Sequence, residues 1–250
     1  MTTYKRDQIR AQKTKKKRRQ RMITVLTVGG IIVFLVALFA IPSIYTIIKN
    51  NSEPVGSFVQ ITPTIRPLEN GKTLGNPNAK VKIEVYEDFQ CPSCKLYTDN
   101  VEPQLLQSTY ISGGQVYYEF MQWPFIDTGS VTQESHQSAN ASMCALEQGR
   151  FWDYHDILFA NQGAENGGSF TNKRLQAFAE SLGLDMTKFN KCFSANTYSS
   201  EINANYKKGV AAGVNSTPSV FLNGKDVSPG QIPTYEQIKS AIDAALAGGG

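Results

Sequence analysis

Two cysteines near the middle of the sequence have the spacing of a redox-active pair. Cys91 and Cys94 are separated by Pro92 and Ser93, where a strand pattern gives way to a helical one. At the start of a helix, free N–H groups and the helix dipole stabilise a thiolate, and proline is tolerated in the first turn. Such a pair exchanges two electrons through a mixed disulfide. We therefore predict that Cys91 is the exposed thiolate and Cys94 the buried resolving thiol.

The other two cysteines, Cys144 and Cys192, leave the pairing open. A zinc site would need them as further ligands beside Cys91 and Cys94, but structural zinc usually draws on two close-spaced pairs, and these two lie far apart. We expect Cys144 and Cys192 to form a structural disulfide, with two unrelated buried thiols as the alternative. A merely structural bond within the CxxC is the other alternative. We expect no metal and no cofactor.

The elements that must position these residues follow from the hydrophobic pattern. Alternating and apolar stretches predict strands, and helical spacing predicts helices. The order is a strand at 81–85, a helix at 95–107, a strand at 116–121, a helical block at about 131–208, a strand at 219–222 and a helix at 234–247. This order predicts an α/β sheet interrupted by a helical insertion. The only histidines, His136 and His155, fall in the helical block, and we expect structural roles for both.

The charges are divided unevenly along the chain. Residues 1–21 contain ten Lys or Arg and one acidic residue, Asp7, whereas the whole chain of 250 residues has a net charge of +4. The head therefore carries +9 and the remainder −5. Because an electrostatic footprint for nucleic acid needs basic residues on the folded surface, we expect no nucleic-acid partner.

An uncharged run of 27 residues, at 22–48, follows the basic head directly. As a helix it would span about 40 Å, more than the roughly 30 Å of the hydrocarbon core. We predict an uncleaved signal anchor with a cytoplasmic N-terminus; a cleaved signal, whose apolar stretch is usually about 7–15 residues, is the alternative. Either way, residues 50–250 lie outside the cytoplasm. We expect a linker at 49–69 and a domain at 70–250.

Several segments resemble the DsbA-like branch of the thioredoxin superfamily, over about residues 70–247. The resembling segments are Asn76 to Ala79, DFQCPSC at 88–94, EQGRFWDYHDILFANQ at 147–162 and GVNSTPSVFLNG at 213–224. The resemblance implies a thioredoxin fold with an inserted helical domain and a catalytic CxxC at Cys91 and Cys94. It also implies a cis proline at Pro218, which would turn the backbone of Thr217 towards a bound peptide. We expect Pro92, Ser93, Thr217 and Pro218 to contact the substrate.

The same resemblance implies thiol–disulfide exchange on exported proteins that carry free thiols. The leading hypothesis is an oxidase that is itself reoxidised by a membrane protein of the DsbB or vitamin K epoxide reductase-like type. A reductase or isomerase with the same site is the first alternative. A non-enzymatic, membrane-anchored chaperone or binding module and a metal carrier are the others.

One position departs from the family pattern. Six residues before the first active-site cysteine the family often has a buried acid that moves a proton to or from the inner thiol, and here that residue is Val85. We interpret the strand alternation as placing Glu84 and Glu87 on the face opposite Val85. This argues against a relay through a buried carboxylate, and our hypothesis is that a water, or Glu87 from the rim, takes that role.

Overall fold

The computed structural model describes residues 3–52 and 54–248. The outermost ends of the predicted head and domain (1–2 and 249–250), and position 53 of the predicted linker, lie outside the described residues. The chain divides into two units, Met1–Lys49 and Asn50–Gly250. Each is described by itself.

The first unit is a single helix. Helix α1 (Thr3–Ser52) continues from the basic head through the uncharged run, and Lys15–Ile41 within it is long and apolar enough to cross a membrane. The prediction of one apolar N-terminal helix is confirmed at the level of length and composition.

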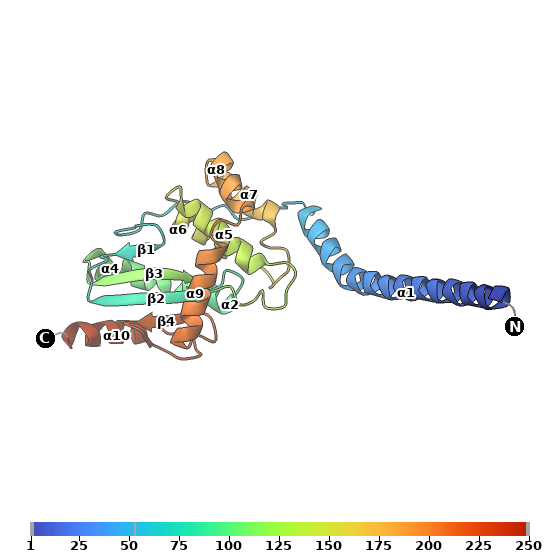
Figure 1. Cartoon of the computed structure of the whole chain (residues 1–250). Helices are drawn as coiled ribbons and strands as arrows, with labels where there is room; N and C mark the ends of the chain where they lie inside the picture. The colour runs from blue at the N-terminus through green and yellow to red at the C-terminus, as the bar shows by residue number, and fades with distance from the viewer. Residues whose placement is uncertain (1–2, 53, 249–250) are drawn as a thin grey trace. The chain divides into compact units, whose positions relative to one another are not determined.

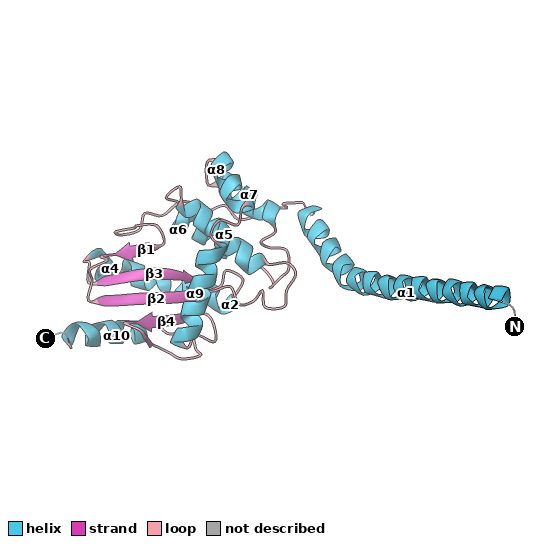
Figure 2. Cartoon of the chain, viewed as in Figure 1, coloured by secondary structure: helices cyan, strands magenta, loops and turns pink. Residues whose placement is uncertain are grey.

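The second unit is built around a mixed five-stranded sheet of order β1-β3-β2-β4-β5 (Figure 2). Its strands are β1 (Thr73–Gly75), β2 (Val81–Glu87), β3 (Val116–Gln122), β4 (Ser219–Leu222) and β5 (Lys225–Asp226). β2 pairs in parallel with β3 and antiparallel with β4. Central strand β2 buries Val81, Ile83 and Val85 completely. This alternation is the pattern that predicts the strand.

Helices flank the sheet in two groups. One group comprises α2 (Pro92–Asn100), α3 (Glu102–Gln107), α4 (Thr109–Ser112) and the C-terminal α10 (Tyr235–Ala247). The other lies between β3 and β4 and comprises α5 (Glu134–Leu146), α6 (Phe151–Ala160), α7 (Asn172–Ser181), α8 (Met186–Ser194) and α9 (Ser199–Ala212). In Figure 1, α5 to α8 gather beside the sheet and α9 leads back to β4. The predicted helical insertion in an α/β sheet is confirmed.

The helix predicted at 95–107 is divided in the structure. α2 ends at Asn100 and α3 begins at Glu102, with Val101 between them. Pro103 lies in the first turn of α3. Proline has no backbone N–H for a helical hydrogen bond and crowds the residues before it, so the chain starts a second helix here.

The residues between α1 and β1 pack along the helical insertion. The rings of Phe58 and Phe178 meet edge to face with centroids 5.0 Å apart. The backbone N–H of Val59 donates to Asn161 Oδ1 at 2.7 Å, and Arg66 pairs with Asp156 at 2.7 Å. This stretch therefore contributes to the folded unit. Within the insertion, Cys144 of α5 and Cys192 of α8 are joined by a disulfide, with Cα atoms 5.7 Å apart.

Candidate active site

Cys91 and Cys94 lie where the central strand passes into α2. Cys91 is the N-cap residue of the helix, with Pro92 in the first turn. Both thiols are free, so the structure holds the dithiol in its reduced form. Cys91 is 6% exposed and Cys94 is 0% exposed. The predicted order of accessibility holds, but the prediction of an exposed Cys91 is wrong, because the backbone of Thr217 lies over its sulfur.

The surroundings of the two thiols separate their pKa values. The hydrogen bond from the Cys94 thiol, together with the backbone N–H groups of Ser93 and Cys94, lowers the pKa of Cys91 to about 6. Burial raises the pKa of Cys94 well above its usual value, and its hydrogen bond to Cys91 and the charge of Glu87 add to this effect. At neutral pH, Cys91 is therefore a thiolate and Cys94 a thiol.

The segment that precedes β4 closes over the first cysteine. Cys91 Sγ lies 3.4 Å from the carbonyl oxygen of Thr217. The peptide bond between Thr217 and Pro218 is cis. Beside them, Pro92 is exposed and Ser93 is half-buried. The fold thus brings the six residues predicted at the CxxC and at Thr217-Pro218 to one place.

A buried carboxylate does lie under the dithiol, and the interpretation that placed Glu87 opposite Val85 is wrong. Residues two apart in a strand point to the same face, so Glu87 shares the face of Val85, and its side chain is only 1% exposed. Glu84 does lie on the other face, where it pairs with Lys208. Burial raises the pKa of Glu87 well above its usual value, and the nearby charges of Glu102 and Cys91 add to this.

Two residues that lie in the segments resembling the family, but for which the sequence predicts no role, hold the loop that presents Cys91. The Gln162 amide donates to the carbonyl oxygens of Phe89 and Cys91, at 2.7 and 3.0 Å. Gln162 follows α6, so this contact ties the helical insertion to the CxxC loop. The folded structure brings Gln162 and this loop together. The spacing of residues in the sequence does not indicate the contact.

Asp88 fixes the same loop from the other side. Its carboxylate accepts the backbone N–H groups of Gln90, Phe125 and Ile126 at 2.9 to 3.1 Å. Burial nevertheless raises the pKa of Asp88 to about 6, against the effect of these hydrogen bonds. The carboxylate therefore links the loop before Cys91 to the loop after β3.

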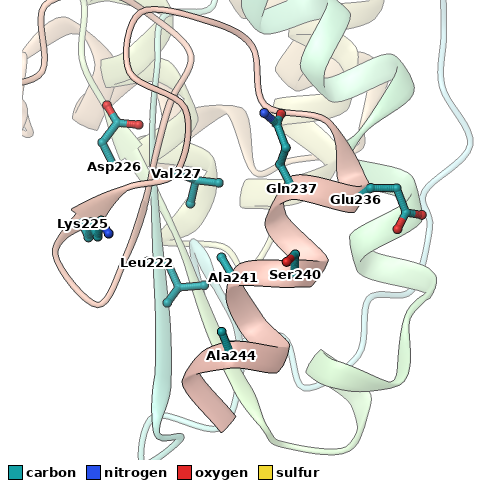
Figure 3. Close-up of a pocket in the computed structure, with 9 residues that line it drawn as sticks. All are labelled: Leu222, Lys225, Asp226, Val227, Glu236, Gln237, Ser240, Ala241 and Ala244. Atoms are coloured by element: carbon teal, nitrogen blue, oxygen red, sulfur yellow. The ribbon is translucent and has the colours of Figure 1, made fainter. Parts of the chain in front are cut away.

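Two further features do not belong to the dithiol site. Cys144 and Cys192 are bonded to each other, so they are not available to complete a zinc site with Cys91 and Cys94. A hollow between the β4–β5 hairpin and α10 is lined by side chains such as Leu222 and Ala241, which lie side by side in Figure 3. None of the residues that line it is a cysteine or a histidine.

Comparisons with known proteins agree with this arrangement. The thioredoxin family matches residues 68–244. One curated relative is "Probable disulfide bond formation protein D" of Bacillus cereus, 25% identical over 219 residues, which cover 87% of this chain and 95% of the relative. Another is "Disulfide bond formation protein D" of Bacillus subtilis, 24% identical over 201 residues, which cover 80% and 86%.

Solved structures show the same fold. The crystal structure of oxidised BdbD from Bacillus subtilis has a TM-score of 0.62 and 23% identity, and the match covers 76% of this chain and 100% of that one. The structure of alpha-DsbA1 from Wolbachia pipientis has a TM-score of 0.58 and 22% identity, covering 74% and 94%. At these identities, the likeness concerns the fold.

Proposed function

The chain belongs to the thioredoxin family and is a DsbA-like protein-disulfide oxidoreductase, and we propose that it introduces disulfides into exported proteins through Cys91 and Cys94. The observation that carries the proposal is the unequal pair of thiols: Cys91 with a pKa of about 6, and Cys94 fully buried behind it. A low pKa stabilises the reduced form of the dithiol, which makes its disulfide a stronger oxidant.

In the proposed reaction the oxidised enzyme takes two electrons from its substrate. A substrate thiolate attacks Cys91 Sγ, the bond between Cys91 and Cys94 breaks, and Cys94 leaves with the electron pair. A second substrate thiolate attacks the substrate sulfur of the mixed disulfide, and Cys91 leaves as a thiolate. The substrate disulfide is released and the enzyme is reduced. The Thr217 carbonyl, beside Cys91 Sγ, is in position to receive a backbone N–H of an extended substrate.

The proposed location follows from the charge pattern and the first helix. We place α1 in the membrane with the basic head in the cytoplasm, because positive charges are retained on that side. The domain from residue 50 onward would then lie outside the cytoplasm, where thiols of exported proteins need oxidation. Reoxidation requires an electron acceptor, and a membrane protein of the DsbB or vitamin K epoxide reductase-like type would lie close to an anchored enzyme.

The proposal is tested by mixing the oxidised full chain, in detergent micelles, with a reduced and unfolded substrate protein whose native form contains disulfides. The oxidation of the substrate is then followed. The oxidised wild-type chain should transfer its disulfide, and Cys91→Ser should abolish transfer. Cys94→Ser, loaded beforehand with glutathione on Cys91, should form a mixed disulfide with a substrate that has a single free thiol and release the glutathione as a thiol. The double variant Cys144→Ala/Cys192→Ala, which keeps only the CxxC, is the matched control and should remain active. Undiminished oxidation of the substrate with Cys91→Ser in place of the wild type would show that the CxxC is not the oxidant, and would favour a binding or chaperone role.

A further inference from the structure

Three buried side chains with metal-binding donor atoms meet in the interior of the second unit. The carboxylates of Glu87 and Glu102 and a ring nitrogen of His155 lie within 4.8 Å of one another. These side chains are 1%, 2% and 0% exposed. Glu87 ends β2, Glu102 begins α3 and His155 lies in α6. Three elements that are distant in the sequence therefore each contribute one residue to this Glu87–Glu102–His155 cluster.

Some donor atoms of the cluster lack the partners that buried polar atoms usually have. Both carboxylate oxygens of Glu87 and the Nε2 atom of His155 are buried, and none of them has a hydrogen-bond partner among the described residues. The surroundings are apolar, with four aromatic rings within 6.0 Å of the His155 ring between centroids: Phe89, Phe120, Trp152 and Phe159. Buried charges are costly unless they are paired or coordinate a metal. A cation bound within the cluster would supply the missing partner.

Neighbouring groups orient the donors as the outer contacts of a metal site do. His155 Nδ1 lies 3.0 Å from Asp156 Oδ1, and a carboxylate in that place fixes the tautomer that leaves Nε2 available to a metal. Tyr118 Oη donates to Glu102 Oε1 at 2.8 Å, which supports the ionised form of Glu102. Two of the three candidate ligands thus have the hydrogen-bonded support that metal ligands usually have.

The donor types and their spacing fit a zinc ion. Zinc binds imidazole nitrogen and carboxylate oxygen at about 2.0 to 2.2 Å, so two donors on one ion lie at most about 4.4 Å apart. The donors of the cluster lie within 4.8 Å of one another, and a small movement of the side chains would bring them onto one ion. The second oxygen of Glu87 can complete a four-coordinate site. Calcium takes about six to eight oxygen ligands, more than this cluster offers.

The charges near the cluster also favour a divalent cation. Within the described part of the chain, neither Glu87 nor Glu102 forms a salt bridge, whereas Asp156 is paired with Arg66 at 2.7 Å. Two unpaired carboxylates balance the charge of one zinc ion. Glu102 and Asp156 also line a surface groove of about 680 Å³ that includes neither cysteine of the CxxC. This groove gives an ion a way in that is separate from the dithiol.

We propose that Glu87, Glu102 and His155 form a binding site for one zinc ion, with Asp156 and Tyr118 holding two of the ligands from outside. The bound ion joins β2, α3 and α6, and so ties the sheet to the helical insertion. The sequence predicts no metal and only a structural role for His155, because the three ligands have no close spacing that would indicate a metal motif. The site does not depend on the exchange reaction proposed above.

Zinc titration of the oxidised full chain in detergent micelles tests the site. The oxidised form is used because a reduced CxxC can itself bind zinc through Cys91 and Cys94. After treatment with a chelator and its removal, zinc is added in competition with a chromophoric chelator, and the wild type should bind one ion per chain. Since loss of an outer contact costs about 10- to 100-fold in metal affinity, Asp156→Asn should weaken binding by that factor. Glu87→Gln and His155→Phe, which remove ligands, should weaken it further.

Matched variants separate this site from zinc held elsewhere on the chain. His136→Gln replaces the other histidine, and Glu84→Gln replaces the acid on the opposite face of β2. Both should bind zinc as tightly as the wild type. Because a ligand that binds only the native state stabilises it, zinc should raise the unfolding temperature of the wild type and of these two controls. It should leave the unfolding temperature of Glu87→Gln and His155→Phe unchanged.

X-ray absorption at the zinc edge identifies the ligands in the wild type, without any substitution. The spectrum of the oxidised chain should show nitrogen and oxygen neighbours at about 2.0 to 2.2 Å, with an imidazole contribution. This measurement decides the question even if Glu87→Gln or His155→Phe does not fold. Sulfur neighbours at about 2.3 Å would place the ion on cysteines and overturn the proposal.

Two further results would overturn the zinc site. One is an oxidised wild type that binds no stoichiometric zinc, which would mean that the cluster is satisfied by protons alone. The other is wild-type zinc affinity in folded Glu87→Gln and His155→Phe, which would show an adventitious ion only. Tighter binding of manganese or calcium than of zinc, in the same competition, would contradict the assignment of the metal.

Discussion

At the scale of single residues, the protein holds two chemically identical side chains in different protonation states. Cys91 lies at the start of α2 with its pKa lowered to about 6, whereas burial raises the pKa of Cys94. In a dithiol with this asymmetry, one sulfur is ionised and can attack or leave, whereas the other remains a protonated thiol. The position of each sulfur on the helix sets its role.

The thiolate of Cys91 should be directly measurable. In the reduced full chain, ultraviolet absorbance of the thiolate should titrate with a midpoint near pH 6. Because the Cys94 thiol contributes the strongest hydrogen bond to Cys91, Cys94→Ala should move the midpoint upward. A midpoint near the usual cysteine value of about 8.5 in the wild type would contradict the proposed reactivity.

Asp88 should give the stability of the domain a pH dependence. Its pKa is raised in the folded state to about 6, so its favourable contribution is complete below about pH 4 and is lost as the pH rises through 6. The shift of about two pKa units corresponds to about 3 kcal/mol of unfolding free energy. We predict that urea unfolding of wild type loses this amount, relative to Asp88→Asn, between pH 4 and 7.

The surface variant Glu180→Gln is the control for Asp88, because Glu180 is exposed at the end of α7. It should follow the wild type at every pH. An unfolding free energy for Asp88→Asn that differs from the wild type by a constant amount across the range would show that Asp88 does not titrate as described.

The sequence predicts part of this site and not the rest, for a physical reason. The CxxC and Thr217-Pro218 are recognisable because their chemistry depends on residue type and local spacing. The face of Glu87 could also have been predicted, since a period of two places it with Val85. Gln162, Asp88 and Glu102 act through contacts with distant segments, and a single sequence does not encode such contacts in any local pattern.

At the scale of elements, the apolar alternation and helical spacing predict the main strands and the insertion, and the tertiary packing decides the boundaries. The pattern at 95–107 is continuous in hydrophobicity, yet Pro103 divides it into α2 and α3. This division affects the interior near the site, because Glu102 at the start of α3 lies within 4.8 Å of Glu87 and His155, measured between carboxylate and ring-nitrogen atoms.

The disulfide between α5 and α8 should stabilise the insertion without taking part in exchange. Cys144 and Cys192 are separated by 48 positions, and closing a loop of that size is worth about 4 kcal/mol in the chain-entropy estimate. Cys144→Ala/Cys192→Ala should therefore lower the unfolding free energy by about that amount in denaturant titrations, with the rate of disulfide transfer unchanged. Loss of transfer in a folded double variant would mean that this bond belongs to the redox machinery.

At the scale of the whole molecule, the basic head and the acidic domain have different roles in the proposed function. The net charge of +4 combines a basic head, which we assign to the cytoplasmic side, with an acidic redox domain outside. The stretch between α1 and β1 packs on the domain through Phe58 and Arg66. In the proposed function, an anchored domain of this kind stays close to a membrane protein that reoxidises it.

The direction of exchange is the central claim, and the reduction potential of the Cys91–Cys94 pair tests it most directly. The full chain would be equilibrated with glutathione buffers of known ratio, and the fraction of reduced dithiol read by mass spectrometry after alkylation. The stabilised Cys91 thiolate predicts a potential nearer to about −120 mV, typical of a strong oxidant, than to about −270 mV. A potential at the thioredoxin end of that range would contradict the oxidase and identify a reductase.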